Sequence, residues 1–196
     1  MPHATIADVT AARRIALHGV TGAGKSTAAR LLADAASRPG APVVTVDYDE
    51  DILWAPASHA AWTLRPEDEQ RARATELIAQ ERWVMASVGS TTYDIVMPRV
   101  DVSIYLDYPP IITFPRLLRR TVTRALTGET CCNDNKESLR LSFLTKDSIL
   151  LWWFKTFRKR HAAALAMESA ADGTPTLRLT HPRQLDLVIA EVAAAH

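Results

Sequence analysis

Short apolar runs alternate along the chain with longer stretches in which apolar residues recur at helical spacing. The short runs, several of them β-branched, predict buried strands, and the longer stretches predict helices that cover a sheet. This alternation is typical of βαβ units, so the sequence predicts an α/β fold with five parallel strands. The predicted strands are residues 15–17, 43–46, 83–87, 102–106 and 177–179. The predicted helices are residues 25–36, 66–81, 111–126, 141–169 (in one or two pieces) and 182–195.

The chain length favours one domain, residues 1–196, because 196 residues leave room for a small insert but not for two full cores. Two connections stand out within this domain. Residues 47–65 are polar and aromatic and contain Trp54 and Trp62. Residues 127–136 contain Gly128 and several polar side chains, which predicts an exposed and mobile loop.

Composition excludes several broad classes of protein. Hydrophobic residues make up 47% and charged residues 23%, which is ordinary for a globular domain and excludes bulk disorder and fibrous repeats. The 23 basic and 22 acidic side chains leave a net charge of +1. A protein that coats nucleic acid over its whole surface is more basic than this, so any basic function is local.

The sequence favours a cytoplasmic protein without a membrane segment. Residues 1–13 contain no apolar region of a secretory signal. The most apolar short stretch, residues 149–154, is far shorter than the ~20 residues that span a bilayer. Cys131 and Cys132 are adjacent, a spacing that suits reduced thiols better than a disulfide framework or a metal site. Vicinal redox chemistry is the alternative for this pair.

The most specific motif follows the first predicted strand. It reads Gly19, Val20, Thr21, Gly22, Ala23, Gly24, Lys25 and Ser26, followed by Thr27, and fits G-x-x-x-x-G-K-[ST]. Glycines let successive N–H groups point inward as an anion nest, and the helix that starts near Lys25 directs its positive end to the same place. Lys25 can reach the β- and γ-phosphates, and the Ser26 hydroxyl can ligate Mg²⁺.

The alternative for this motif is a glycine turn with an incidental lysine. The context favours a phosphate loop, because the motif follows a predicted strand and opens a predicted helix. The motif predicts a bound nucleotide together with Mg²⁺. It does not determine what happens to the γ-phosphate.

Arginines gather on one face of the predicted helix 111–126. They are Arg116, Arg119, Arg120 and Arg124, with Arg124 at the margin of the face. Like charges on one face repel each other, so phosphates are natural partners for them. A second basic cluster lies later in the chain and consists of Lys155, Arg158, Lys159 and Arg160. A solvated face, ion pairs with neighbours such as Glu129, and contact with nucleic acid are the alternatives.

At this point the chain resembles the adenylate-kinase-like branch of P-loop kinases, and in particular the small bacterial topology modulation proteins. The resemblance covers nearly the whole chain, and only the phosphate loop is diagnostic by itself. The other parts that carry it are residues 81–84, 92–94, 98–99, 104–107, Pro109, the pair Arg116 and Arg120, and residues 177–180.

The resemblance implies a three-layer P-loop kinase-like fold, in which helices cover both faces of a five-stranded parallel sheet. It implies a small mobile lid at about residues 120–145 and an acceptor-side insert at about residues 48–82. The implied activity is phosphoryl transfer from ATP to a small acceptor, such as a nucleotide or nucleoside.

Site residues are also implied by the resemblance. Arg116 is expected over the donor adenine and Arg120 at the phosphates, which makes Lys25, Arg116 and Arg120 the catalytic candidates. Arg158 and Arg160 are expected to reach the phosphates from beyond the lid, with Arg158 as the nucleotide-binding candidate. Closure of residues 127–136 would bring these arginines against the transferring group. The turn at residues 180–183 is expected near the donor base.

The chain departs from the family pattern at the end of the third strand. The family usually carries an acidic residue there, in an Asp-Gly context, whereas this chain has Ala86. Loss of a carboxylate near the metal removes charge where phosphoryl transfer needs the ion positioned. The candidates that compensate are Asp47, Asp49, Asp94 and Asp107, of which Asp47 and Asp49 are also candidate bases for the acceptor hydroxyl.

Three functional hypotheses follow. The first is an ATP-dependent kinase of a small molecule, from the phosphate loop and the arginines. The second is a nucleotide-binding regulator with little or no turnover, from Ala86. The third, and weakest, is a DNA-associated module that uses the basic helices, because no base-reading motif accompanies them.

Overall fold

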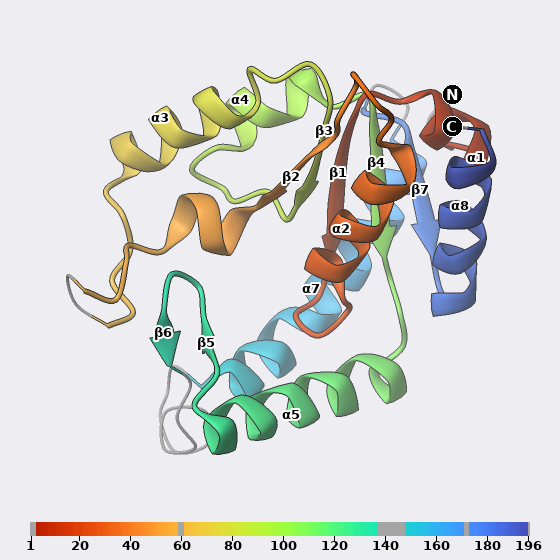
Figure 1. The fold of residues 1–196 in the computed structure, drawn as a ribbon. Coiled ribbons are helices and arrows are strands. Elements are labelled where there is room, and N and C mark those ends of the chain that lie inside the picture. Colours follow the sequence, from red (N-terminus) through yellow and green to blue (C-terminus); the bar gives the residue numbers. More distant parts are fainter. Residues whose placement is uncertain (1–2, 59–60, 137–147, 171–172, 196) are drawn as a thin grey trace.

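A computed structural model describes residues 3–58, 61–136, 148–170 and 173–195, and it contains a five-stranded parallel sheet at its centre (Figure 1). The strand order is β2-β3-β1-β4-β7, and every neighbouring pair is parallel. The strands are β1 (Arg14–Gly19), β2 (Val44–Asp47), β3 (Trp83–Ala86), β4 (Val102–Leu106) and β7 (Thr176–Leu179). All five strands predicted from the hydrophobic pattern are therefore confirmed.

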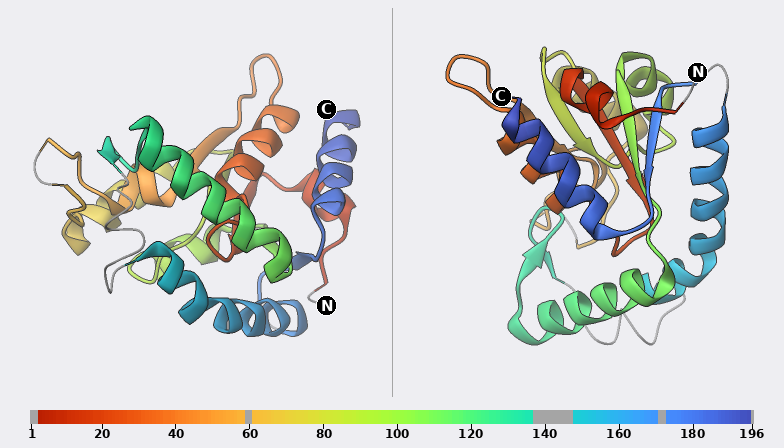
Figure 2. Two further views of the ribbon diagram at one scale, coloured as in Figure 1. Left: turned by 90° about the horizontal axis from the view of Figure 1, so that it is seen from below. Right: turned by 90° about the vertical axis from the view of Figure 1, so that its right-hand side faces the viewer.

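Helices cover both faces of the sheet and complete three layers (Figures 1 and 2). One face carries α1 (Ile6–Ala11), α2 (Lys25–Ala36) and α8 (Pro182–Ala194). The other carries α3 (Glu67–Leu77), α4 (Tyr93–Val96) and α7 (Ile149–Ser169). Alternation along β1 sends Ile15 and Leu17 into the first core and Ala16 into the second. The predicted α/β fold with two covered faces is confirmed.

Helix α5 (Pro110–Thr127) crosses the edge of the sheet at which the strands end (Figure 2). It packs directly on the phosphate loop. A Cβ atom added at Gly22 would lie 2.6 Å from the Thr113 carbonyl oxygen and 2.9 Å from the Leu117 Cβ. Only a residue without a side chain therefore permits this approach of helix to loop.

Residues 127–136 are mostly exposed, as predicted, but they are not an irregular loop. After α5 the chain forms a β-hairpin of β5 (Thr130–Cys131) and β6 (Asn135–Lys136). Its turn holds Cys132, Asn133 and Asp134 at φ values of 50°, 60° and 62°. Asn and Asp tolerate this left-handed region, which permits a tight turn where polarity alone predicts a loop. The remainder of the predicted lid, and residues 141–147 of the predicted long helix, lie outside the described residues.

Several elements differ from the sequence prediction. Helix α3 ends at Leu77, four residues before the predicted end. The connection after β2 contains a π-helical turn, η1 (Tyr48–Leu53). Helices α1, α4 and the 3₁₀ turn η2 (Met97–Arg99) were not predicted, because segments this short carry little periodic signal. None of the described helices combines the length and the apolar character needed to cross a bilayer.

Candidate functional site

The sequence motif of residues 19–27 forms the connection from β1 into α2. Strand β1 ends at Gly19, and α2 begins at Lys25. Gly24 precedes the helix at φ 95°, and no side chain caps the first turn of α2. The first amides of the helix are thus left without a side-chain acceptor, at the end of the helix whose dipole attracts an anion.

Lys25 lies half-buried in the centre of this loop. Its Nζ donates a hydrogen bond to the Val20 carbonyl oxygen at 3.3 Å. Burial lowers the pKa of Lys25 from its ordinary value to about 8, and the positive charges of Arg160 and Arg120 lower it further. The carboxylates of Asp49 and Asp47 oppose this shift. Charges from four elements therefore act on this one lysine: carboxylates from the end of β2 and from η1, and guanidinium groups from α5 and α7.

Arg120 and Arg160 come from different helices. Arg120 lies on α5, and Arg160 lies on α7, where its carbonyl oxygen accepts a hydrogen bond of 2.7 Å from the Tyr105 hydroxyl. Residues two positions apart on a helix are separated by about 200°, so Arg158 faces away from the side of α7 that carries Arg160. The side chain from α7 that acts on Lys25 is thus Arg160.

The arginines of α5 surround a surface cavity of about 340 Å³. Its lining residues are Arg116, Arg119, Arg120, Thr123, Arg124 and Glu129. Glu129 lies 3.8 Å from Arg124, so the ion pairing considered as an alternative for this face accounts for Arg124. The charge of Arg116 also acts on Tyr108. Burial raises the pKa of Tyr108 to about 12, and the positive charge of Arg116 opposes this rise.

Asp47 lies beside Ala86, the position at which this chain has no acidic residue. The two residues are direct partners in the register of β2 and β3, and Ala86 is paired on its other side with Leu17 of β1. The Asp47 carboxylate accepts a hydrogen bond from the Asp49 amide at 3.1 Å. The surrounding protein desolvates Asp49, and together with the charge of Asp47 this raises the pKa of Asp49.

Asp94 and Asp107 are engaged elsewhere. The Asp94 carboxylate accepts two hydrogen bonds from the Arg71 guanidinium, at 2.8 and 2.9 Å. The Asp107 side chain is 6% exposed and pairs with Arg178 and His161, each at 3.0 Å. Of the four candidate carboxylates, the structure brings Asp47 and Asp49 to Lys25.

His18 lies directly before the phosphate loop, and sequence reasoning did not single it out. Its ring is 7% exposed and stacks on Tyr105 with centroids 5.7 Å apart. Burial lowers the pKa of His18 to about 4, helped by the charges of Arg160 and Lys25. The histidine is therefore neutral at physiological pH and contributes packing beneath the loop.

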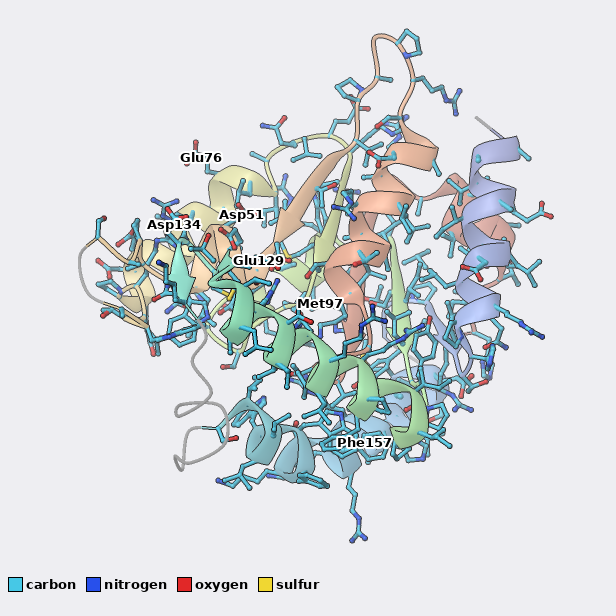
Figure 3. All side chains as sticks on the ribbon, turned by 60° about the horizontal axis from the view of Figure 1, so that its bottom comes forward. Asp51, Glu76, Met97, Glu129, Asp134 and Phe157 are labelled. Carbon is cyan, nitrogen blue, oxygen red and sulfur yellow. The ribbon has the colours of Figure 1, made fainter. Side chains whose placement is uncertain are left out.

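The hairpin tip is a second feature that sequence reasoning missed. Figure 3 marks it by Asp134, η1 by Asp51 and the end of α5 by Glu129. The Asn133 amide donates to Glu50 Oε1 at 2.9 Å, and its side chain donates to the Trp54 carbonyl oxygen at 2.8 Å. The one sequence signal was the polar pair Asn133-Asp134, which suits left-handed turn positions.

The turn expected near the donor base, residues 180–183, leads into α8 and includes its first two residues. The Thr180 and His181 amides donate to Gln184 Oε1 at 2.7 and 2.9 Å, and His181 caps the helix. Tyr108 lies between this helix and α5, since Asp186 and Arg116 both act on its hydroxyl. The turn is thus at the same end of the molecule as the start of α5.

The residues present fit a magnesium–nucleotide complex. Ser26 and Thr27 are exposed in the first turn of α2, where no side chain takes up the amides. Among the residues that the structure describes, no three His, Cys, Asp or Glu side chains form a self-contained metal cluster. Magnesium is usually held by one or two protein oxygens together with substrate phosphates, so Ser26 and Asp47 are a sufficient protein share.

Comparison with known proteins gives one family match. The family described as "Helicase HerA, central domain" matches residues 6–106, which include the phosphate loop and strands β1 to β4. No curated protein sequence matches the chain.

Solved structures with a similar fold are small kinases. Shikimate kinase from Bacteroides thetaiotaomicron aligns with a TM-score of 0.51 and 16% identity, over 93% of this chain and 97% of its own. A gluconokinase from Sinorhizobium meliloti aligns with a TM-score of 0.48 and 16% identity, over 93% of this chain and 90% of its own. Deoxyadenosine kinase from M. mycoides aligns with a TM-score of 0.45 and 13% identity, over 92% of this chain and 99% of its own. At these identities the likeness is one of fold, and the alignment with shikimate kinase shows a P-loop kinase-like fold.

Proposed function

The chain belongs to the family of the helicase HerA central domain, whose match includes residues 19–27. From this loop and the charged residues around it, we propose that the protein binds ATP with Mg²⁺ and transfers a phosphoryl group to a small acceptor. Within P-loop proteins we place it in the adenylate-kinase-like branch, near the topology modulation proteins. We assign residues 1–196 to one domain, with residues 48–82 on the acceptor side and residues 120–145 as the lid.

The observation that carries this proposal is the set of charges around Lys25. Two arginines from separate helices and two carboxylates, Asp47 at the end of β2 and Asp49 in η1, act on its ammonium group. A protein that only bound a magnesium–nucleotide complex would need the arginines and one carboxylate for the metal ion. The second carboxylate adds what group transfer needs, namely an acceptor for a proton close to the phosphates.

Each residue has a distinct role in this proposal. The amides of residues 19–27 and Lys25 hold the triphosphate, and Ser26 and Asp47 are the magnesium ligands. A bound magnesium ion would neutralise charge on the phosphate oxygens. Arg120 and Arg160 contact the transferred group, with Arg116 at the donor nucleoside, and positive charge there stabilises the transition state.

Asp49 is the candidate general base. Its pKa is raised, so it holds a proton more readily than an ordinary aspartate. A carboxylate with a raised pKa is better matched to accept the proton of an acceptor hydroxyl near neutral pH. Ala86 is then no loss of function, because Asp47 on the adjacent strand supplies the missing charge.

Acceptor-dependent turnover tests the proposal. The purified protein is incubated with ATP, Mg²⁺ and a panel of nucleosides, nucleotides, sugars and other small alcohols, and ADP is measured. We expect one acceptor class to raise ADP formation well above the rate without acceptor. Lys25→Ala abolishes this rise, and Asp49→Asn lowers it about 100-fold or more, the usual contribution of a general base.

Asp94→Asn is the matched control, because its carboxylate pairs with Arg71 outside the site. It should leave the rate within about twofold, since an exposed ion pair contributes little to the fold. Tight ATP binding without acceptor-dependent ADP from any compound in the panel would favour a regulator instead and would reject phosphoryl transfer.

A second candidate function follows from the family match alone. The family's name refers to a helicase, which favours ATP hydrolysis coupled to nucleic acid. The exposed arginines of α5 are the surface that would contact phosphate backbone. DNA that raises hydrolysis in a salt-sensitive manner, where no small acceptor does, would support this candidate over the first.

A further inference from the structure

The hairpin β5–β6 and the segment after β2 are far apart in the sequence but form one contact. Asn133 bonds to residues 79 and 83 positions earlier in the chain, and its carbonyl oxygen accepts a hydrogen bond of 2.9 Å from the Ala57 amide. The Trp62 indole donates to the Lys136 carbonyl oxygen at 3.2 Å. Figure 1 shows the hairpin directly beside this segment.

The contact is made at the carbonyl end of η1. A helix leaves its last carbonyl oxygens without partners inside the helix, and these must be satisfied by other groups. Two backbone amides donate to this end of η1: Trp54 to the Asp49 carbonyl oxygen at 3.3 Å, and Arg65 to the Leu53 carbonyl oxygen at 2.9 Å. The Asn133 side-chain amide donates to the carbonyl oxygens of Glu50 and Trp54, so it supplies two further donors at this end.

The same turn carries the carboxylates of the site. Asp47 caps the start of η1, and its carboxylate holds the Asp49 amide. A π-helical turn is rare and is often found at functional sites. Its six residues are too few to be stable as an isolated helix, so its shape depends on contacts from outside.

The hairpin tip contacts the acidic part of η1, because the Asn133 amide donates to Glu50 Oε1 at 2.9 Å. The pKa of Cys132 lies far above its ordinary value, because of its contact with Cys131, burial, and the negative charges of Asp49 and Glu50. The hairpin tip therefore packs on the side of η1 that bears the acidic residues.

We propose that Asn133 is a positioning residue for phosphoryl transfer: its side-chain amide caps the carbonyl end of η1 and so fixes Asp47 and Asp49 opposite Lys25. The part of this inference that concerns phosphoryl transfer rests on the proposed function, whereas the cap on η1 does not. Docking of the hairpin and assembly of the carboxylates are then one event. Asn133 also satisfies the geometry of the turn, because asparagine tolerates its φ of 60°.

The chain offers a matched pair of variants. Asn133 and Asp134 are adjacent, and both have a left-handed backbone that glycine adopts freely. Asn133→Gly removes the two side-chain donors to η1, whereas Asp134→Gly removes only a weak contact to Thr130 at 3.4 Å. Asn133→Asp keeps the size of the side chain and replaces the donating amide by a carboxylate.

The first readout is hydrogen exchange at the amides of Trp54 and Ala57, which requires no activity. We expect exchange about tenfold faster in Asn133→Gly and Asn133→Asp and unchanged in Asp134→Gly, because loss of the cap opens η1. The second readout is acceptor-dependent turnover. We expect kcat to fall about 10- to 100-fold in both Asn133 variants while KM for ATP stays within about twofold, since a small displacement of a catalytic group costs this much.

The outcomes separate the inference from the proposed function. Suppose first that the wild type does turn over an acceptor. Exchange at wild-type rates in both Asn133 variants, or an unchanged kcat in both of them, would then overturn the inference and leave phosphoryl transfer standing. A wild type that turns over no acceptor would overturn the proposed function, and with it the catalytic half of the inference. The hydrogen-exchange result alone would then show whether Asn133 caps η1.

Discussion

Gly22 and Gly24 occupy the same loop under different constraints. Both have positive φ values, 86° and 95°. A Cβ at Gly22 would also meet α5, whereas a Cβ at Gly24 would meet nothing within 4 Å. The two positions therefore separate the cost of a left-handed backbone from the cost of a steric clash.

We expect Gly24→Ala to lower the free energy of unfolding by about 1 kcal/mol, the price of a left-handed alanine. Gly22→Ala should lower it by about 2–4 kcal/mol, because overpacking against the Thr113 carbonyl is added. Urea denaturation of the two variants beside the wild type measures both values. Equal losses in the two variants would show that α5 does not rest on the loop.

His18 makes stability depend on pH in a defined window. Its pKa is about 4 in the folded protein and about 6.5 in an unfolded chain, so the unfolded state takes up the proton first. This stabilisation is present above pH 6.5 and is lost as pH falls from there towards 4. The shift of about 2.5 units corresponds to about 3 kcal/mol over the window.

The measurement is the urea midpoint at several pH values for the wild type and for His18→Gln, which cannot be protonated. The wild type should lose stability more steeply than the variant between pH 6.5 and 4. Parallel curves for the two proteins would mean that His18 is accessible to protons in the folded state.

At the scale of elements, α7 shows what a sequence motif leaves open. The cluster of basic residues on it was visible in the sequence, and both Arg158 and Arg160 were candidates for the phosphates. Which of them faces Lys25 depends on how the helix is rotated against β4, and the Tyr105–Arg160 contact fixes that rotation. A contact across 55 residues has no local signal in the sequence.

Arg160→Ala and Arg158→Ala form a matched pair on this helix. We expect Arg160→Ala to weaken binding of Mg·ATP about tenfold, as loss of one charge-assisted contact to phosphate does. Arg158→Ala should change the affinity less than twofold. Titration calorimetry on both variants measures this, and a larger effect at Arg158 would reverse the assignment.

The same distinction applies to the other elements. The five strands were predicted because each is a buried apolar run, a signal contained within the run itself. The β5–β6 hairpin and η1 were missed, because each is short and polar and is held by contacts with the other. The helical pattern of α5 predicted where the helix begins and ends, but it did not predict that the helix packs on Gly22.

For the whole molecule, the sheet order brings distant residues to one edge. Strands β1, β3 and β2 are neighbours and end at one edge of the sheet, so Gly19, Ala86 and Asp47 all lie at this edge although they span 67 positions of the sequence. The phosphate loop was predictable from its motif alone. The position of Asp47 beside Ala86 was not, because it depends on the register of β2 against β3.

The central claim is that residues 19–27 bind a magnesium–nucleoside triphosphate, and titration calorimetry tests it most directly. Folded wild-type protein, checked by circular dichroism, is titrated with Mg·ATP, and Lys25→Ala is titrated in parallel. We expect a 1:1 complex with a Kd of about 1–100 µM, which corresponds to roughly 5–8 kcal/mol. The variant should bind at least about 30-fold more weakly. Absence of any heat from the wild type with ATP or GTP, or equal affinity in Lys25→Ala, would contradict the account.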